Sequence, residues 1–121
     1  MPSAPDLVGY LEAGLKGTRL RQALIANNLA NLDTPAFRRN DTMFERTLSE
    51  AIESGKPADL DESEAWIFTP ATTPVAPNGN DVDLDMEVGQ MIKNVSLYKT
   101  YIRLLGRTYK QMDLAMRDSM V

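Results

Sequence analysis

Apolar residues in the last third of the chain recur at alternating steps of four and three residues. The alternation runs without a break from residue 84 to residue 116. Such steps keep one apolar stripe on one face of a helix, as in a coiled-coil seam or a tight helix pair. We therefore predict one long helix over residues 86–119, with a seam at these positions: Leu84, Val88, Met91, Val95, Tyr98, Ile102, Leu105, Tyr109, Met112 and Met116.

This helix is too long for the body of its own chain. At ~1.5 Å per residue it would extend about 50 Å, whereas a compact domain of this length is only roughly 26–28 Å across. The seam therefore needs cover from a second long helix or from a surface outside the chain.

A second helical pattern occupies residues 6–32. Asp6 is suited to cap its start, while Gly9, Gly14 and Gly17 each weaken it by about 1 kcal/mol relative to alanine. Such a helix needs a partner to form, and the C-terminal stripe is the natural one, within one subunit or between two. The apolar positions recur at helical intervals: Leu7, Leu11, Leu15, Ile25, Leu29 and Leu32.

The chain between the two helical patterns is predicted to be less regular. Pro35 disfavours the α conformation of the preceding residue, so the first helix should end before Thr34. Residues 33–55 are then a turn and a short helix, and residues 56–85 an acidic, loop-rich insert with several prolines. Within that insert, residues 65–69 are a candidate short strand or an apolar anchor.

The predicted fold is mainly α, as a single unit over residues 1–121. Its long N- and C-terminal helices pair as a coiled-coil-like bundle. The short, irregular, loop-rich middle can carry a small β element.

Charge is distributed in three blocks along this chain. Residues 1–48 have a balance of +1, residues 49–87 of −9 and residues 88–121 of +4, within a net charge of −4. Such blocks are typical of solvated faces. The functional alternative is packing of basic helices against the acidic inserts of neighbouring copies.

Composition argues against several kinds of site. The chain has no histidine and no cysteine, which removes the commonest metal ligands, the thiol nucleophile and the usual general base. A calcium loop starting at Asp81 would require Gly and Glu where Met86 and Ile92 stand. We predict no catalytic residue, no metal and no cofactor. No apolar run reaches the ~18 residues of a membrane span, and the N-terminus lacks the pattern of a cleavable secretory signal.

The stretch Asn27-Asn28-Leu29-Ala30-Asn31-Leu32-Asp33-Thr34-Pro35-Ala36-Phe37-Arg38 is the most specific signal. Asn28 and Asn31 lie three apart on one helical face, and their amides can satisfy carbonyls freed where the helix stops. Thr34-Pro35 then forces extension, and Phe37 supplies an apolar plug. This order of residues resembles the signature that ends the first helix of bacterial flagellar rod, hook and filament-type axial proteins.

A second motif narrows the resemblance to the FlgB-type proximal rod proteins of the flagellar basal body. Asp83 or Asp85 can cap the final helix, and the acids suit the positive end of its dipole. Ala36 stands where the family usually has glycine, which disfavours a positive-φ turn there, and Phe37 replaces the usual tyrosine. The motif reads Asn78-Gly79-Asn80-Asp81-Val82-Asp83-Leu84-Asp85-Met86-Glu87.

The resemblance implies a structural subunit rather than an enzyme. Proteins of this type assemble helically at the base of the flagellar rod, next to the membrane ring, with copies of themselves and neighbouring proximal rod subunits. They leave the cell through the flagellar export apparatus without a cleaved signal peptide, and they do not insert into the membrane. Phe44 and Leu48 match the spacing of an export-gate recognition motif, for which packing in the core is the alternative.

Three alternative functions are also compatible with parts of the sequence. One is another rod subunit of the FlgC type. A second is a cytosolic coiled-coil adaptor or secretion chaperone. The third, nucleic-acid binding through the basic C-terminal helix, is disfavoured by a pI of about 4.8 and by basic residues spread around the helix.

Overall fold

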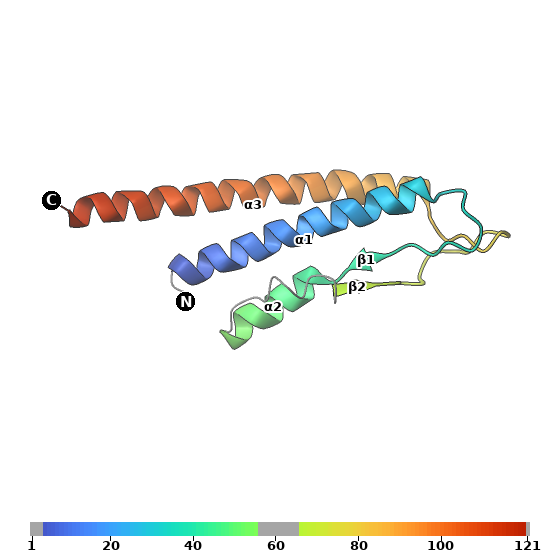
Figure 1. The fold of residues 1–121 in the computed structure, drawn as a ribbon, viewed down its shortest axis with the longest axis horizontal. Helices are drawn as coiled ribbons and strands as arrows, with labels where there is room; N and C mark the ends of the chain where they lie inside the picture. The colour runs from blue at the N-terminus through green and yellow to red at the C-terminus, as the bar shows by residue number, and fades with distance from the viewer. Residues whose placement is uncertain (1–3, 56–65, 121) are drawn as a thin grey trace.

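The computed structural model describes residues 4–55 and 66–120, which form three helices and one two-stranded sheet (Figure 1). The predicted mainly α fold with long terminal helices and a small β element is confirmed. The elements in chain order are α1 (Ala4–Ala30), β1 (Asp41–Thr42), α2 (Phe44–Ser54), β2 (Ile67–Phe68) and α3 (Leu84–Ser119).

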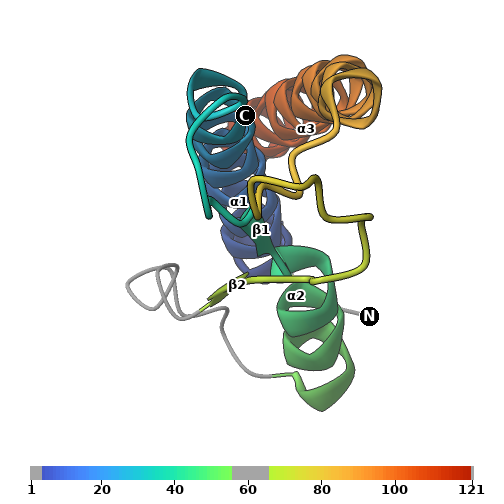
Figure 2. The ribbon, with the colours of Figure 1, turned by 90° about the vertical axis from the view of Figure 1, so that its right-hand side faces the viewer.

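The two terminal helices pair within one chain. In Figure 1, α1 and α3 lie side by side and run in opposite directions, so that both chain ends are at the same end of the molecule. Helix α1 is central, because α3 contacts one side of it and α2 with β1 contact another, as the end-on view of Figure 2 shows. The central position explains why the apolar residues of α1 are not confined to a single narrow stripe.

The helix starts differ from the predicted ones in detail. Helix α3 begins at Leu84 because Asp83 is its N-cap residue, and the Asp83 Oδ1 atom accepts a hydrogen bond from the backbone N–H of Met86 at 3.1 Å. Asp85 lies in the first turn, where the positive end of the helix dipole stabilises a negative charge. The predicted cap at Asp6 is wrong, because α1 begins at Ala4 and Asp6 lies inside its first turn.

The middle of the chain forms α2 and a short antiparallel pair of strands, β1 and β2, which α2 separates in the sequence. Helix α2 ends at Gly55, which adopts the left-handed conformation with φ 69°. Strand β1 was not predicted, because two polar residues, Asp41 and Thr42, carry no periodic signal. Thr42 pairs with Ile67 of β2, and the backbone N–H of Met43 donates to the carbonyl of Trp66 at 2.9 Å. The Trp66 side chain is buried.

The apolar core lies between α1 and α2. Tyr10 and Ala13 of α1 pack with Leu48 of α2, and Phe44 at the start of α2 has a relative exposure of 0%. A Cβ atom on Gly17 would overlap the ring of Phe44, whereas Gly9 has no neighbour that a Cβ atom would meet. The glycine at position 17 is therefore required by the close approach of α2, not merely tolerated.

Two alanine substitutions in α1 should have opposite effects on stability. Gly17→Ala forces the Phe44 ring to move and should lower the free energy of unfolding by roughly 1–3 kcal/mol, as overpacking does. Gly9→Ala is the matched control and should raise it by up to about 1 kcal/mol through helix propensity alone. Thermal and urea unfolding followed by circular dichroism measure both. Equal effects of the two changes would contradict the packing role of Gly17.

Candidate assembly site at the helix junction

The C-terminal end of α1 is capped by a side chain from the second motif. The Asn80 Nδ2 atom donates to the carbonyl oxygens of Asn31 and Thr34 at 2.8 and 2.9 Å. Asn31 follows the last residue of α1 and Thr34 lies in the turn after it, so Asn80 binds the turn that ends the helix. Locally, the Thr34 hydroxyl donates to Asn31 Oδ1 at 3.1 Å, and Asn31 Nδ2 donates to the carbonyl of Asn27 at 2.8 Å. The first motif therefore ends the helix with the help of the second.

Backbone hydrogen bonds join the same two segments. The N–H of Ala36 donates to the carbonyl of Asn78 at 2.9 Å, and the N–H of Asp81 donates to the carbonyl of Phe37 at 3.3 Å. Ala36 has φ 62°, so the expectation that alanine would prevent a positive-φ turn here is wrong. The hydrogen bonds on both sides hold the turn. A Cβ atom on Gly79 would lie 3.2 Å from the Ala36 Cα atom, so the two turns also contact each other directly.

Asn28, about one turn earlier in α1, also joins this helix to a distant segment of the chain. Its side chain is fully buried, and its amide makes a pair of hydrogen bonds with the backbone of Asn40: Nδ2 donates to the carbonyl at 2.9 Å and Oδ1 accepts from the N–H at 3.0 Å. Asn28 Nδ2 also lies 3.3 Å from Glu87 Oε1. One amide therefore joins α1, the segment after it and the first turn of α3.

A buried ion pair lies at the centre of this junction. Arg39 Nε donates to Glu87 Oε1 at 2.5 Å, and both side chains are buried. The backbone N–H of Arg39 donates to Asp81 Oδ1 at 2.6 Å, and Asp81 Oδ2 lies 3.7 Å from Arg38 Nε. Burying these charges without partners would be costly. The segment after α1 and the start of α3 must therefore meet in this register.

Arg21 forms a second polar cluster, between α1, β1 and α2. Its guanidinium donates to Asp41 Oδ1 at 3.1 Å, to the Thr42 carbonyl at 2.8 Å and to both carboxylate oxygens of Glu45. It also lies 4.8 Å above the centre of the Phe44 ring. Burial opposes the charged form, but the hydrogen bond to Glu45 and the charges of Glu45 and Asp41 raise the pKa of Arg21 above its ordinary value.

The face of α3 that contacts α1 is not the predicted apolar seam alone. A second 4-3 stripe turns towards α1, and it includes polar side chains. Asn94 is buried and donates to the carbonyl of Thr18 at 2.8 Å and to Gln22 Oε1 at 3.0 Å. The residues of this stripe are buried or half-buried: Glu87, Met91, Asn94, Tyr98, Tyr101, Leu105, Thr108 and Met112.

The other half of the predicted seam is exposed from Val95 onwards, whereas Val88 is half-buried. The two stripes share Met91, Tyr98, Leu105 and Met112, and α1 covers that side of α3. Relative exposure reaches 46% at Ile102 and 63% at Met116. The exposed seam comprises four residues seven apart along α3: Val95, Ile102, Tyr109 and Met116.

Only some of the residues predicted as an assembly motif contribute their side chains to the junction. Asn28 and Asn31 take part in the junction, whereas Thr34 contributes its carbonyl and Phe37 is only half-buried. Pro35 is exposed at the turn. Sequence reasoning missed the roles of Arg39, Asn80 and Glu87. Their only sequence signal is that they stand within or next to the two motifs.

The described part of the chain contains neither a group of three or more acidic residues, histidines or cysteines that could hold a metal ion, nor a helix that could span a membrane.

Comparison with known proteins gives the class to which this junction belongs. The family model described as flagella basal body rod protein matches residues 11–38. That stretch covers most of α1 and the turn that Asn80 caps. The matched stretch is therefore similar to the rod proteins of the flagellar basal body.

Several relatives carry the name flagellar basal body rod protein FlgB. The protein of Aeromonas hydrophila is 30% identical over 98 residues, which cover 71% of this chain and 74% of the relative. That of Borrelia hermsii is 28% identical over 81% of this chain and 86% of the relative, and that of Bacillus subtilis is 26% identical over 84% and 86%. The chain belongs to the FlgB family of flagellar basal body rod proteins.

Removing one partner of the buried ion pair should destabilise the chain much more than removing both. Glu87→Leu leaves the buried Arg39 with only the more distant carboxylate of Asp41, at 3.6 Å, and should lower the free energy of unfolding by about 3 kcal/mol. Adding Arg39→Met should recover most of this loss. Urea unfolding of both single variants and the double variant gives the coupling energy. The control is Glu50→Ala, which removes an exposed partner of Arg46 and should change stability by less than about 1 kcal/mol.

The two asparagines of the first motif should contribute unequally. Asn28→Ala leaves the partly buried N–H and carbonyl of Asn40 without their side-chain partner and should cost roughly 1–3 kcal/mol. Asn31→Ala loses only local hydrogen bonds at the helix end and should cost about 1 kcal/mol or less. Unfolding curves compare the two, and a larger loss for Asn31→Ala would contradict the junction as described.

Proposed function

We propose that this chain builds the proximal part of the flagellar rod, assembling helically with copies of itself and with neighbouring rod subunits through its terminal helices. As a member of the FlgB family, it is a structural subunit of the flagellar basal body rod. The names of the relatives favour the proximal FlgB type over the FlgC type and over a cytosolic adaptor or chaperone.

The exposed seam on α3 is the single observation that supports assembly through the terminal helices. One side of α3 is covered by α1, and the adjacent side leaves Val95, Ile102, Tyr109 and Met116 exposed. The Tyr109 hydroxyl, at the edge of this side, also donates to Glu12 Oε1 of α1 at 3.1 Å. A row of large apolar residues along a helix is stabilised when another helix covers it. A neighbouring subunit supplies that cover in an assembled rod.

Charges on the outer surface of α3 fit the same arrangement. The exposed face carries Lys93, Lys99, Arg103 and Arg107, and the middle of the chain is strongly acidic. Attraction between such surfaces on neighbouring copies sets encounter rate and register more than it adds affinity. We place the assembled subunit at the base of the rod, beside the membrane ring.

Export requires a less folded chain than the one described. Phe44 and Leu48, proposed as an export-gate recognition motif, are both buried against α1. An export apparatus could bind them only after α2 has separated from α1. In the folded subunit, the packing of Phe44 and Leu48 in the core explains why the two residues are four apart. The export gate would recognise them only in the unfolded chain.

A charge in the exposed seam should block assembly without unfolding the subunit. Ile102 is 46% exposed, so Ile102→Asp should leave the helical circular dichroism spectrum and the unfolding midpoint close to those of the original chain. In the rod the carboxylate would be buried without a partner, so cells that carry only this variant should be non-motile. The matched control is Ser96→Asp on the opposite side of α3. Normal motility with Ile102→Asp would contradict a role of the exposed seam in assembly.

A further inference from the structure

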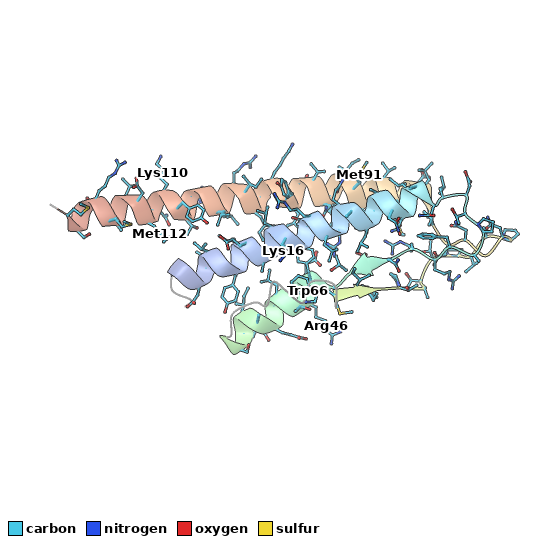
Figure 3. All side chains as sticks on the ribbon, viewed as in Figure 1. Lys16, Arg46, Trp66, Met91, Lys110 and Met112 are labelled. Carbon is cyan, nitrogen blue, oxygen red and sulfur yellow. The ribbon has the colours of Figure 1, made fainter. Side chains whose placement is uncertain are left out.

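Helix α3 extends past the end of α1. Two contacts fix the register of the pair: Asn28 with Glu87, and Gly14 with Tyr101. The numbers in each pair add to 115, so Ala4, the first residue of α1, lies level with residue 111. Residues 112–120 lie beyond that level and form an overhang of about 13 Å at ~1.5 Å per residue. Figure 3 places Met112 on this part of α3, beyond the N-terminal end of α1.

The overhang carries a stripe of methionines. Met112, Met116 and Met120 are four residues apart. Met112 ends the stripe that faces α1, and Met116 belongs to the exposed seam. Relative exposure is 63% at Met116 and 84% at Met120. Methionine side chains are flexible and polarizable, so they suit contacts with an apolar surface on another molecule.

A groove between α1 and α3 offers a matching surface. Its volume is about 430 Å³, and Ala23, Ala26 and Val95 on its walls are exposed. The small alanines allow another helix to approach closely, and the ring of Tyr98 can contact a thioether sulfur. Six of the residues that line the groove are Thr18, Gln22, Ala23, Ala26, Val95 and Tyr98.

We propose that the methionine overhang of one copy docks into the α1–α3 groove of a neighbouring copy of this chain. The inference rests on the proposed rod function and identifies one contact within it. The groove is continuous with the exposed seam, because Val95 belongs to both. Asp113 borders the methionines and pairs with the exposed Arg117 at 3.2 Å within α3. Arg19 borders the groove, so its charge can share this carboxylate at the edge of the contact.

The positions of the overhang and the groove on the chain determine which kind of assembly this contact can form. The overhang and the groove are different parts of the same chain, about 20 residues or roughly 30 Å apart along α3. A contact between different surfaces of identical subunits is heterologous, and it generates an open helical array unless the rotation closes a ring. Repetition of this contact gives a filament, not a closed dimer.

Crosslinking in assembled rods tests this contact directly. The chain has no cysteine of its own, so Ala26→Cys and Met116→Cys can be placed on separate copies expressed in the same cells. Treatment of purified basal bodies with a short bismaleimide crosslinker should give a covalent dimer of the two variants. A second pair, Ala23→Cys with Met120→Cys, should behave in the same way. The matched control, Leu114→Cys with Ala26→Cys, places the thiol on the opposite face of the overhang and should give no dimer.

The outcomes separate this contact from the proposed function. Basal bodies that contain both variants but give no dimer with either pair would overturn the contact and leave the rod function standing. A dimer that forms equally with Leu114→Cys would also overturn it. Absence of the unmodified chain from purified basal bodies would overturn the rod function, and this contact with it.

Discussion

The buried ion pair between Arg39 and Glu87 is the constraint on which the rest of the subunit depends. Two desolvated charges are tolerated only when they meet with good geometry, so the segment after α1 and the first turn of α3 have one register. Asn28 joins the same carboxylate to α1. The antiparallel alignment of the terminal helices follows from this fixed point. The same fixed point determines which side of α3 is covered by α1 and how far α3 extends past α1.

The signature residues act mainly inside the subunit. Asn28 bonds to Asn40, and Asn80 bonds to the end of α1 at Asn31. Both motifs therefore build one internal junction, and the surfaces proposed to contact neighbouring subunits lie elsewhere, on α3 and beside α1. A substitution in the signature can abolish assembly because the terminal helices lose their alignment, even though the altered residue contacts no other copy.

Local features of the sequence were predictable, and contacts across the chain were not. Helical periodicity, the cap at Asp83 and the glycine end of α2 depend on residues close together in the sequence. The partners of Asn80 and Glu87 are more than 40 residues away, and each is a polar residue of a type common on surfaces. The 4-3 steps also fit two stripes that share Tyr98 and Leu105, so periodicity alone could not decide which side of α3 faces α1. The family resemblance supplied the function, because no side-chain chemistry in this chain would indicate it.

The hairpin arrangement of the two long helices has a mechanical consequence. Both chain ends lie at one end of the molecule and the Arg39–Glu87 junction lies near the other (Figure 1). A force applied at the N-terminal end of α1 therefore removes this helix turn by turn, first from Tyr109, then from Tyr101 and then from Asn94. It reaches the charged junction only after most of the helix pair has separated. Pulling from this end begins at weak contacts and meets its greatest resistance last.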